Sequence, residues 1–173
     1  FDANIETGTK ADLFLGQLPS TNVSGTEAAK FANWLTSGDA LQGAYLFSDA
    51  TTLTGIDRNA ALATYGTVYV LPTEDEWFKA AYYKSDGSGY TLYPTGDSEP
   101  VSNVDARYDM QGSDGPWKVG SGTIENNGTY DMGGNVWERT EIFTDIRGGR
   151  WLNSPYHFGV GTLASTYRLT PIN

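Results

Sequence analysis

The chain has 173 residues, a formal net charge of −10 and no cysteine. This length suits one compact domain, and the acidic balance argues against binding to nucleic acid, whose phosphate backbone needs clustered Lys and Arg. The lack of cysteine excludes disulfides, thiolate metal sites and thiol redox chemistry from this chain, and no apolar run approaches the ~18 residues of a membrane span.

The first clear element is a helix that begins after Ser24, because residues 1–23 show no strong hydrophobic period. Ser24 and Glu27 have the capping-box spacing, in which the serine oxygen accepts from the first turn and the glutamate reaches back to the cap backbone. Gly38 is suited to end this helix. The helical period predicts one apolar face, made of Ala28, Phe31, Ala32, Trp34 and Leu35.

The following segment contains a long irregular stretch and one expected strand. Residues 39–66 are rich in Gly, Thr and Ala without a firm period, and we expect a long excursion there. Thr67–Leu71 predicts a short strand, because β-branched and aromatic residues favour the pleated conformation.

A second helix is expected after Thr73, which forms another capping box with Glu76. Trp77 and the alanines that follow it lie at helical spacing, and the Gly- and Ser-rich segment 85–89 ends the helix. From 90 to 128, Gly and Pro recur at short intervals, so this region predicts ordered loops with short strands.

The segment Gly133–Glu138 (Gly-Gly-Asn-Val-Trp-Glu) combines a permissive backbone with one carboxylate. Glycine allows carbonyl groups to turn inward and Glu138 adds an anionic oxygen, and such hard oxygens are the ligands that calcium prefers. The alternative is structural: Glu138 pairs with a buried arginine and the glycines make a turn.

Three blocks, in this order and roughly at this spacing, resemble the formylglycine-generating-enzyme (sulfatase-modifying factor) superfamily. They are Leu71–Trp77 (LPTEDEW), Gly133–Glu138 (GGNVWE) and Arg147–Trp151 (RGGRW), where the family reads approximately LPTEAEWEYAA, YDMxGNVWEW and RGGSW. The resemblance covers roughly residues 19–173, with 1–18 weakly matched, and we expect a single α+β domain over residues 1–173. Its expected fold is a loop-rich variant of the C-type-lectin fold, with two main helices and short antiparallel strands.

The resemblance also implies calcium sites. One matches the backbone of Gly133, Gly134 and Val136 with the carboxylate of Glu138. The family's other site uses an asparagine, the next carbonyl and a later aspartate, which match Asn103, Val104 and either Asp109 or Asp114. A solvated polar loop is the alternative for this second set.

The resemblance implies a fold without the family's oxidase chemistry. In those enzymes, copper-bound cysteines follow the RGGSW block, whereas this chain has Asn153 at the first cysteine position and Phe158 or Ala164 at the second. None of these side chains is a soft thiolate ligand, so copper is not expected. His157 is the one histidine of the chain, which is too few for the histidine-rich iron centres of other members.

We therefore expect a non-catalytic, calcium-stabilised extracellular or cell-surface domain of bacterial origin, with any signal peptide already removed. Related receptors bind ligands through the block after RGGSW, so the expected contact surface is Arg150, Asn153, Tyr156, His157, Phe158 and Tyr167. The partner would be a protein or glycan ligand, or a second copy of the chain. Three alternatives stay open: these aromatic residues complete the core, the chain is a subunit of a filament or surface layer, or it is an enzyme with non-thiol chemistry.

Overall fold

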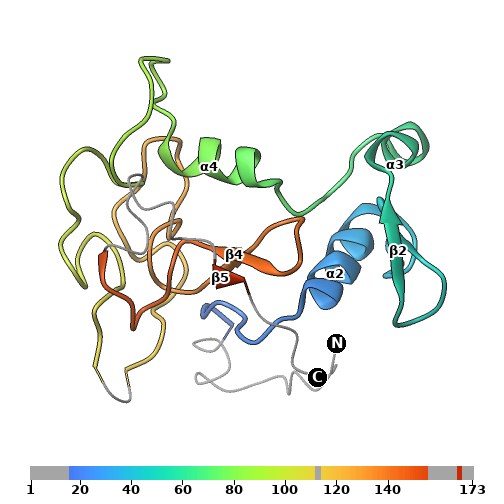
Figure 1. Ribbon diagram of the computed structural model, residues 1–173, viewed down its shortest axis with the longest axis horizontal. Coiled ribbons are helices and arrows are strands. Elements are labelled where there is room, and N and C mark those ends of the chain that lie inside the picture. The colour runs from blue at the N-terminus through green and yellow to red at the C-terminus, as the bar shows by residue number, and fades with distance from the viewer. Residues whose placement is uncertain (1–15, 112–113, 156–166, 169–173) are drawn as a thin grey trace. The chain divides into compact units, whose positions relative to one another are not determined.

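The computed structural model describes residues 16–111, 114–155 and 167–168 (Figure 1). Helices and short antiparallel strands give an α+β fold, as the sequence predicted. The described residues divide into two compact units: one contains Asn22–Phe78 with Arg139–Arg147 and residues 167–168, and the other contains the described part of Lys79–Glu138 with residues 16–21 and 148–155. Within the described ranges, no helix is both long and apolar enough to cross a bilayer.

Helix α2 (Gly25–Ser37) has the boundaries that its capping residues predict. Glu27 N–H donates to Ser24 Oγ over 3.2 Å, and Ser24 N–H donates to Glu27 Oε2 over 2.7 Å. Gly38 adopts the left-handed conformation (φ 83°) and its N–H bonds to Trp34 O. Both end signals are therefore confirmed.

The predicted apolar face of α2 is largely wrong. The helix buries Ala29, Ala32 and Asn33, whereas Trp34 is 53% exposed and Phe31 is 41% exposed. The reason is the polar side chain of Asn33, which donates to Tyr45 O over 2.8 Å and accepts from Tyr45 N over 3.0 Å. This amide bonds to a strand as a neighbouring strand would, and small alanines beside it let the helix approach closely.

The stretch predicted as irregular, 39–66, contains two strands and a helix. Strands β1 (Tyr45–Phe47) and β2 (Leu53–Ile56) pair antiparallel, and α3 (Arg58–Tyr65) follows directly (Figure 1). Asp57 caps α3 by accepting from Ala60 N over 2.8 Å. Strands of three and four residues and a helix of eight are too short to establish a readable period.

The strand predicted at Thr67–Leu71 does not form. Side chains satisfy its backbone instead: Tyr69 N–H donates to Thr36 Oγ1 over 2.9 Å, and Leu71 N–H donates to Tyr45 Oη over 2.7 Å. Its apolar residues still serve the core, because Val68, Val70 and Leu71 pack against the buried cluster that contains Tyr45. The β propensity of this segment therefore indicates burial correctly and strand pairing wrongly.

Helix α4 (Glu74–Tyr82) begins with the predicted capping box of Thr73 and Glu76, whose two bonds measure 2.8 and 3.2 Å. Trp77, Ala81 and Tyr82 are buried. After this helix, the described residues up to 137 contain isolated bridges and no strand. The loop-rich character is confirmed, while the short strands expected there are reduced to single bridges.

The last strands form a small sheet in the order β3 (Glu138–Arg139), β4 (Asp145–Arg147) and β5 (Tyr167–Arg168). β4 and β5 run antiparallel side by side in Figure 1, with Ile146 opposite Tyr167. The two RGGRW arginines therefore differ in setting. Arg147 lies in a fully buried strand, whereas Arg150 is exposed beyond it.

Candidate functional site

The loop Gly133–Glu138 is fixed chiefly by Asn135, which is 1% exposed. Its N–H donates to Arg107 O over 2.7 Å, its Oδ1 accepts from Trp117 N over 3.0 Å, and its carbonyl accepts from Trp151 N over 3.0 Å. Asn135 also has a positive φ of 55°, a conformation that asparagine tolerates better than most residues. One residue thus holds the loop to three distant segments.

Several oxygen atoms of this loop are placed to receive a donor or a cation. Among the described residues, no hydrogen bond reaches the carbonyls of Gly134 or Val136. Two more oxygens, Glu138 Oε2 and Met132 O, lie close to Gly148. A Cβ built on this glycine would collide with both of them. A carboxylate and backbone carbonyls are the ligand types of calcium, so the residues present fit such an ion. Met132 and Gly148 were missed by the sequence, since only the fold brings them to Glu138.

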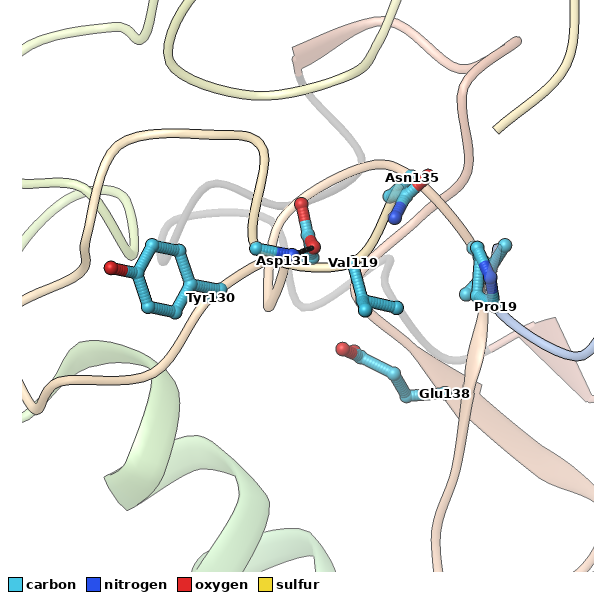
Figure 2. Close-up of a pocket in the computed structure, with 8 residues that line it drawn as sticks. Pro19, Val119, Tyr130, Asp131, Asn135 and Glu138 are labelled. Carbon is cyan, nitrogen blue, oxygen red and sulfur yellow. Dashed lines mark hydrogen bonds between the residues drawn. The ribbon is translucent and has the colours of Figure 1, made fainter. Parts of the chain in front are cut away.

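Glu138 also lines an open pocket of about 420 Å³ (Figure 2). Pro19, Val119 and Tyr130 supply apolar surface, and the carboxylate end of Glu138 is turned toward Val119 and Asp131. The carboxylate of Asp131 already accepts from Trp117 Nε1 over 2.8 Å and from Gly120 N over 2.9 Å. The carboxylate of Asp131 is therefore held by the pocket wall, and Glu138 contributes a second carboxylate to the lining.

A buried carboxyl group supports the start of the same loop. Glu125 is 5% exposed, and it accepts from Met132 N over 3.0 Å and from Thr129 Oγ1 over 2.9 Å. Burial disfavours the charged form and raises the pKa of Glu125 to about 7, although these hydrogen bonds act in the opposite direction. Glu125 belongs to no motif, so nothing in the sequence distinguishes it from surface acids.

The second expected calcium set is arranged differently. The Arg107 guanidinium donates from Nη1 to Asn103 Oδ1 and from Nε to Gly115 O over 3.1 Å. Val104 is 62% exposed, and Asp109 and Asp114 are exposed as well. Among the described residues, neither aspartate carboxylate forms a hydrogen bond with Asn103. The structure therefore places the Arg107 guanidinium at Asn103 Oδ1, the first of the predicted oxygens.

Asn153, at the family's first cysteine position, closes a turn. Its Oδ1 accepts from Arg150 N over 2.9 Å, its N–H donates to Arg150 O over 2.9 Å, and its carbonyl accepts from Asp109 N over 2.8 Å. The Arg150 guanidinium lies 5.7 Å from the centre of the Trp151 ring. Of the other predicted contact residues, Tyr156, His157 and Phe158 lie outside the described residues, and Tyr167 belongs to β5.

Comparison with known proteins identifies relatives by sequence and by fold. Residues 4–164 match the family model of the sulfatase-modifying factor enzyme 1-like domain. Of the solved structures, one described as CarF is 28% identical (TM-score 0.59), with 80% of this chain and 58% of that chain covered. Treponema denticola variable protein 1 is 23% identical (TM-score 0.58), with 84% and 64% covered. This chain thus spans less than two thirds of either solved chain.

No curated protein gives a significant match to the sequence. The family model nevertheless extends from residue 4 to residue 164, and the fold agrees with both solved neighbours. The chain therefore belongs to the family of sulfatase-modifying factor enzyme 1-like, or formylglycine-generating-enzyme-like, domains.

Proposed function

We propose that this chain is a non-catalytic, calcium-stabilised extracellular domain with a binding or structural role. The observation that carries the proposal is Asn153, which stands where the family's oxidases have a cysteine, in a chain without any cysteine. Its amide oxygen is used to close the turn with Arg150. An amide in this role supplies neither the nucleophile nor the soft ligand that copper oxidase chemistry needs.

The calcium part of the proposal is supported by the donor set of the Gly133–Glu138 loop. The Gly134 and Val136 carbonyls accept no hydrogen bond within the described chain, and Glu138 adds an anionic oxygen beside Met132 O. An ion bound there would join the backbone carbonyls of the loop to the carboxylate of Glu138. The net charge of −10 further favours the uptake of a divalent cation.

Thermal melts in chelator and in millimolar calcium test this site. A ligand that binds only the folded state raises the free energy of unfolding by about 2.7 kcal/mol at one hundred times its dissociation constant, so the wild type should melt higher with calcium. Glu138→Gln should remove most of this difference, because the amide keeps the shape and loses the charge. Glu99→Gln, a charge change at an exposed glutamate, serves as the control.

Equal melting temperatures in chelator and calcium, with no ion detected by elemental analysis, would refute the calcium site. The glycines would then only make a turn, and Glu138 would have the structural role of the alternative interpretation. The assignment as a non-catalytic domain would remain, since it depends on Asn153 and not on the ion.

The proposed contact surface follows the RGGRW block and includes Arg150, Asn153, Tyr156, His157, Phe158 and Tyr167. Arg150 supports this choice, because its exposed guanidinium stacks on Trp151 and leaves hydrogen-bond donors accessible. Light scattering distinguishes a monomer that binds a protein or glycan from a self-associating subunit.

A further inference from the structure

We propose that the side chain of Arg107 is a built-in cation that takes the place of a second calcium ion in this chain. The expected second site began with Asn103 Oδ1, the oxygen that would bind the metal. In the structure this atom accepts a hydrogen bond from Arg107 Nη1, and Gly115 O accepts from Arg107 Nε over 3.1 Å. The guanidinium therefore lies between two oxygens that come from different parts of the loop.

The guanidinium satisfies these acceptors as a metal ion would, with a fixed charge and a planar set of donors. Asn103 is held in a left-handed conformation (φ 58°), and its N–H donates to Ala106 O over 2.8 Å. This turn brings Asn103 and Arg107 together across four positions of the chain. The site is thus formed by local backbone geometry and needs no external ion to join Asn103 to Gly115.

The carboxylate nearest to Asn103 in sequence already has hydrogen-bond partners. The acid nearest in sequence, Asp105, is already used: it accepts from Val101 N over 2.8 Å and from Thr123 Oγ1 over 2.6 Å. Asp114 is exposed, and its carboxylate forms no hydrogen bond with Asn103 among the described residues. A divalent ion at Asn103 Oδ1 would therefore meet the positive charge of the Arg107 guanidinium, which already occupies this oxygen.

Arg107 also supports the neighbouring loop through its backbone. Arg107 O accepts from Asn135 N over 2.7 Å, and a Cβ on Gly134 would collide with the same carbonyl. The side chain of Arg107 thus joins Asn103 to Gly115, and its carbonyl supports the loop that contains Glu138. Truncation of the side chain removes the first connection and leaves the second in place, so the two roles can be separated.

The decisive comparison uses Arg107→Ala, Arg107→Lys and Arg150→Ala in the full chain. Without metal, Arg107→Ala should melt several degrees below the wild type, because Asn103 Oδ1 and Gly115 O lose their donors. The melting temperature of Arg107→Lys should lie between those of Arg107→Ala and the wild type, since an ammonium group keeps the charge but lacks the planar, two-armed geometry of a guanidinium. Arg150→Ala removes an equal charge from an exposed position and, among side-chain contacts, that with the Trp151 ring, so it should lower the melting temperature much less than Arg107→Ala. An Arg107→Ala protein as stable as the wild type in chelator would overturn the proposal.

Calcium content provides an independent measurement. Asn103→Ala should leave the number of calcium ions per chain, measured by elemental analysis after desalting from calcium buffer, equal to that of the wild type. A loss of one ion in Asn103→Ala would show that Asn103 binds calcium and would overturn the proposal. The result does not depend on Glu138: if the wild type binds no calcium, the Gly133–Glu138 site fails while the stability of Arg107→Ala still tests the role of Arg107.

Discussion

Gly148 shows how closely the oxygens around Glu138 are packed. Its φ is 83°, and a side chain there would collide with Glu138 Oε2 and Met132 O. Gly38, at the end of α2, has the same φ of 83°, but no atom lies within 4 Å of the position that a Cβ would take there. The two glycines therefore separate the cost of a left-handed backbone from the cost of crowding at the site.

Gly148→Ala should accordingly be more destabilising than Gly38→Ala. Both alanines bear a left-handed conformation, which costs roughly 1 kcal/mol. Only Gly148→Ala adds overpacking, worth about 1–3 kcal/mol, and it should also weaken calcium binding because Glu138 must move. Urea denaturation of both variants measures the difference, and equal losses would mean that the site relaxes around a methyl group.

At the scale of elements, α4 is ended by a side chain from a distant loop. Asn127 Nδ2 donates to Lys79 O and Ala80 O over 3.1 Å each, and to Tyr83 O over 2.7 Å. The last carbonyls of a helix have no partner within it, so this amide acts as a C-terminal cap.

Asn127→Asp should destabilise the protein by about 1–2 kcal/mol, measured by chemical denaturation. The change removes the donors and places a negative charge at the negative end of the helix dipole. Asn127→Ala removes the donors alone, so the aspartate should be the worse of the two at neutral pH. If the two variants are equally stable, the repulsion between the carboxylate and the helix end is negligible.

A second link between elements is the ion-pair network of Arg58 at the start of α3. Its guanidinium donates to both carboxylate oxygens of Glu76, over 2.8 and 3.0 Å, and to Glu141 Oε1 over 2.9 Å. The hydrogen bond from Arg58 lowers the pKa of Glu76 from 4.5 to about 2. A carboxyl group with a lowered folded-state pKa stabilises the fold above its unfolded pKa, and this contribution disappears as the pH falls through the folded value.

The melting temperature should therefore fall as the pH is lowered from about 4.5 to about 2, and Glu76→Gln should reduce that fall. The expected contribution is about 1 kcal/mol or less, because the Glu76 side chain is 51% exposed and solvent screens the pair. Glu99→Gln is again the matched control. A pH profile of Glu76→Gln that parallels the wild type between these values would contradict the assignment.

The elements that were predictable are those with local signals. Ser24, Glu27 and Gly38 determine the ends of α2 within one turn of the chain, and the same holds for Thr73 and Glu76 at α4. The buried face of α2 was not predictable from periodicity, because Asn33 replaces an apolar residue through its bonds to Tyr45. Asp57 and Gly66 cap α3, but no helix was predicted between them, because 39–66 has no firm hydrophobic period.

The candidate site divides in the same way. Glu138 and its glycines form one contiguous motif, so the sequence predicts them together. Met132 O above Gly148, and the Arg107 guanidinium at Asn103, depend on how distant or irregular segments meet. Met132 is joined to Gly148 by tertiary contact, and Arg107 reaches Asn103 through an irregular turn without a recognisable motif, so neither Arg107 nor Glu125 was among the predicted site residues.

At the scale of the whole molecule, we expect that membership of the family does not bring the family's oxidase reaction. The purified protein should convert no cysteine of a sulfatase peptide to formylglycine in the presence of Cu(I) and oxygen, because the chain has no thiol. Mass spectrometry of the peptide measures conversion, and a reaction without protein provides the control. Turnover above that control would refute the non-catalytic assignment.

The segment Thr67–Leu71 has one more consequence, which concerns aggregation. Five consecutive uncharged residues of high β propensity are the kind of sequence that adds strands from other molecules. In the folded chain, the amides of Tyr69 and Leu71, which an added strand would use, are occupied by the Thr36 and Tyr45 hydroxyls. A strand from another molecule could pair with these two amides only after the bonds to the Thr36 and Tyr45 hydroxyls were broken.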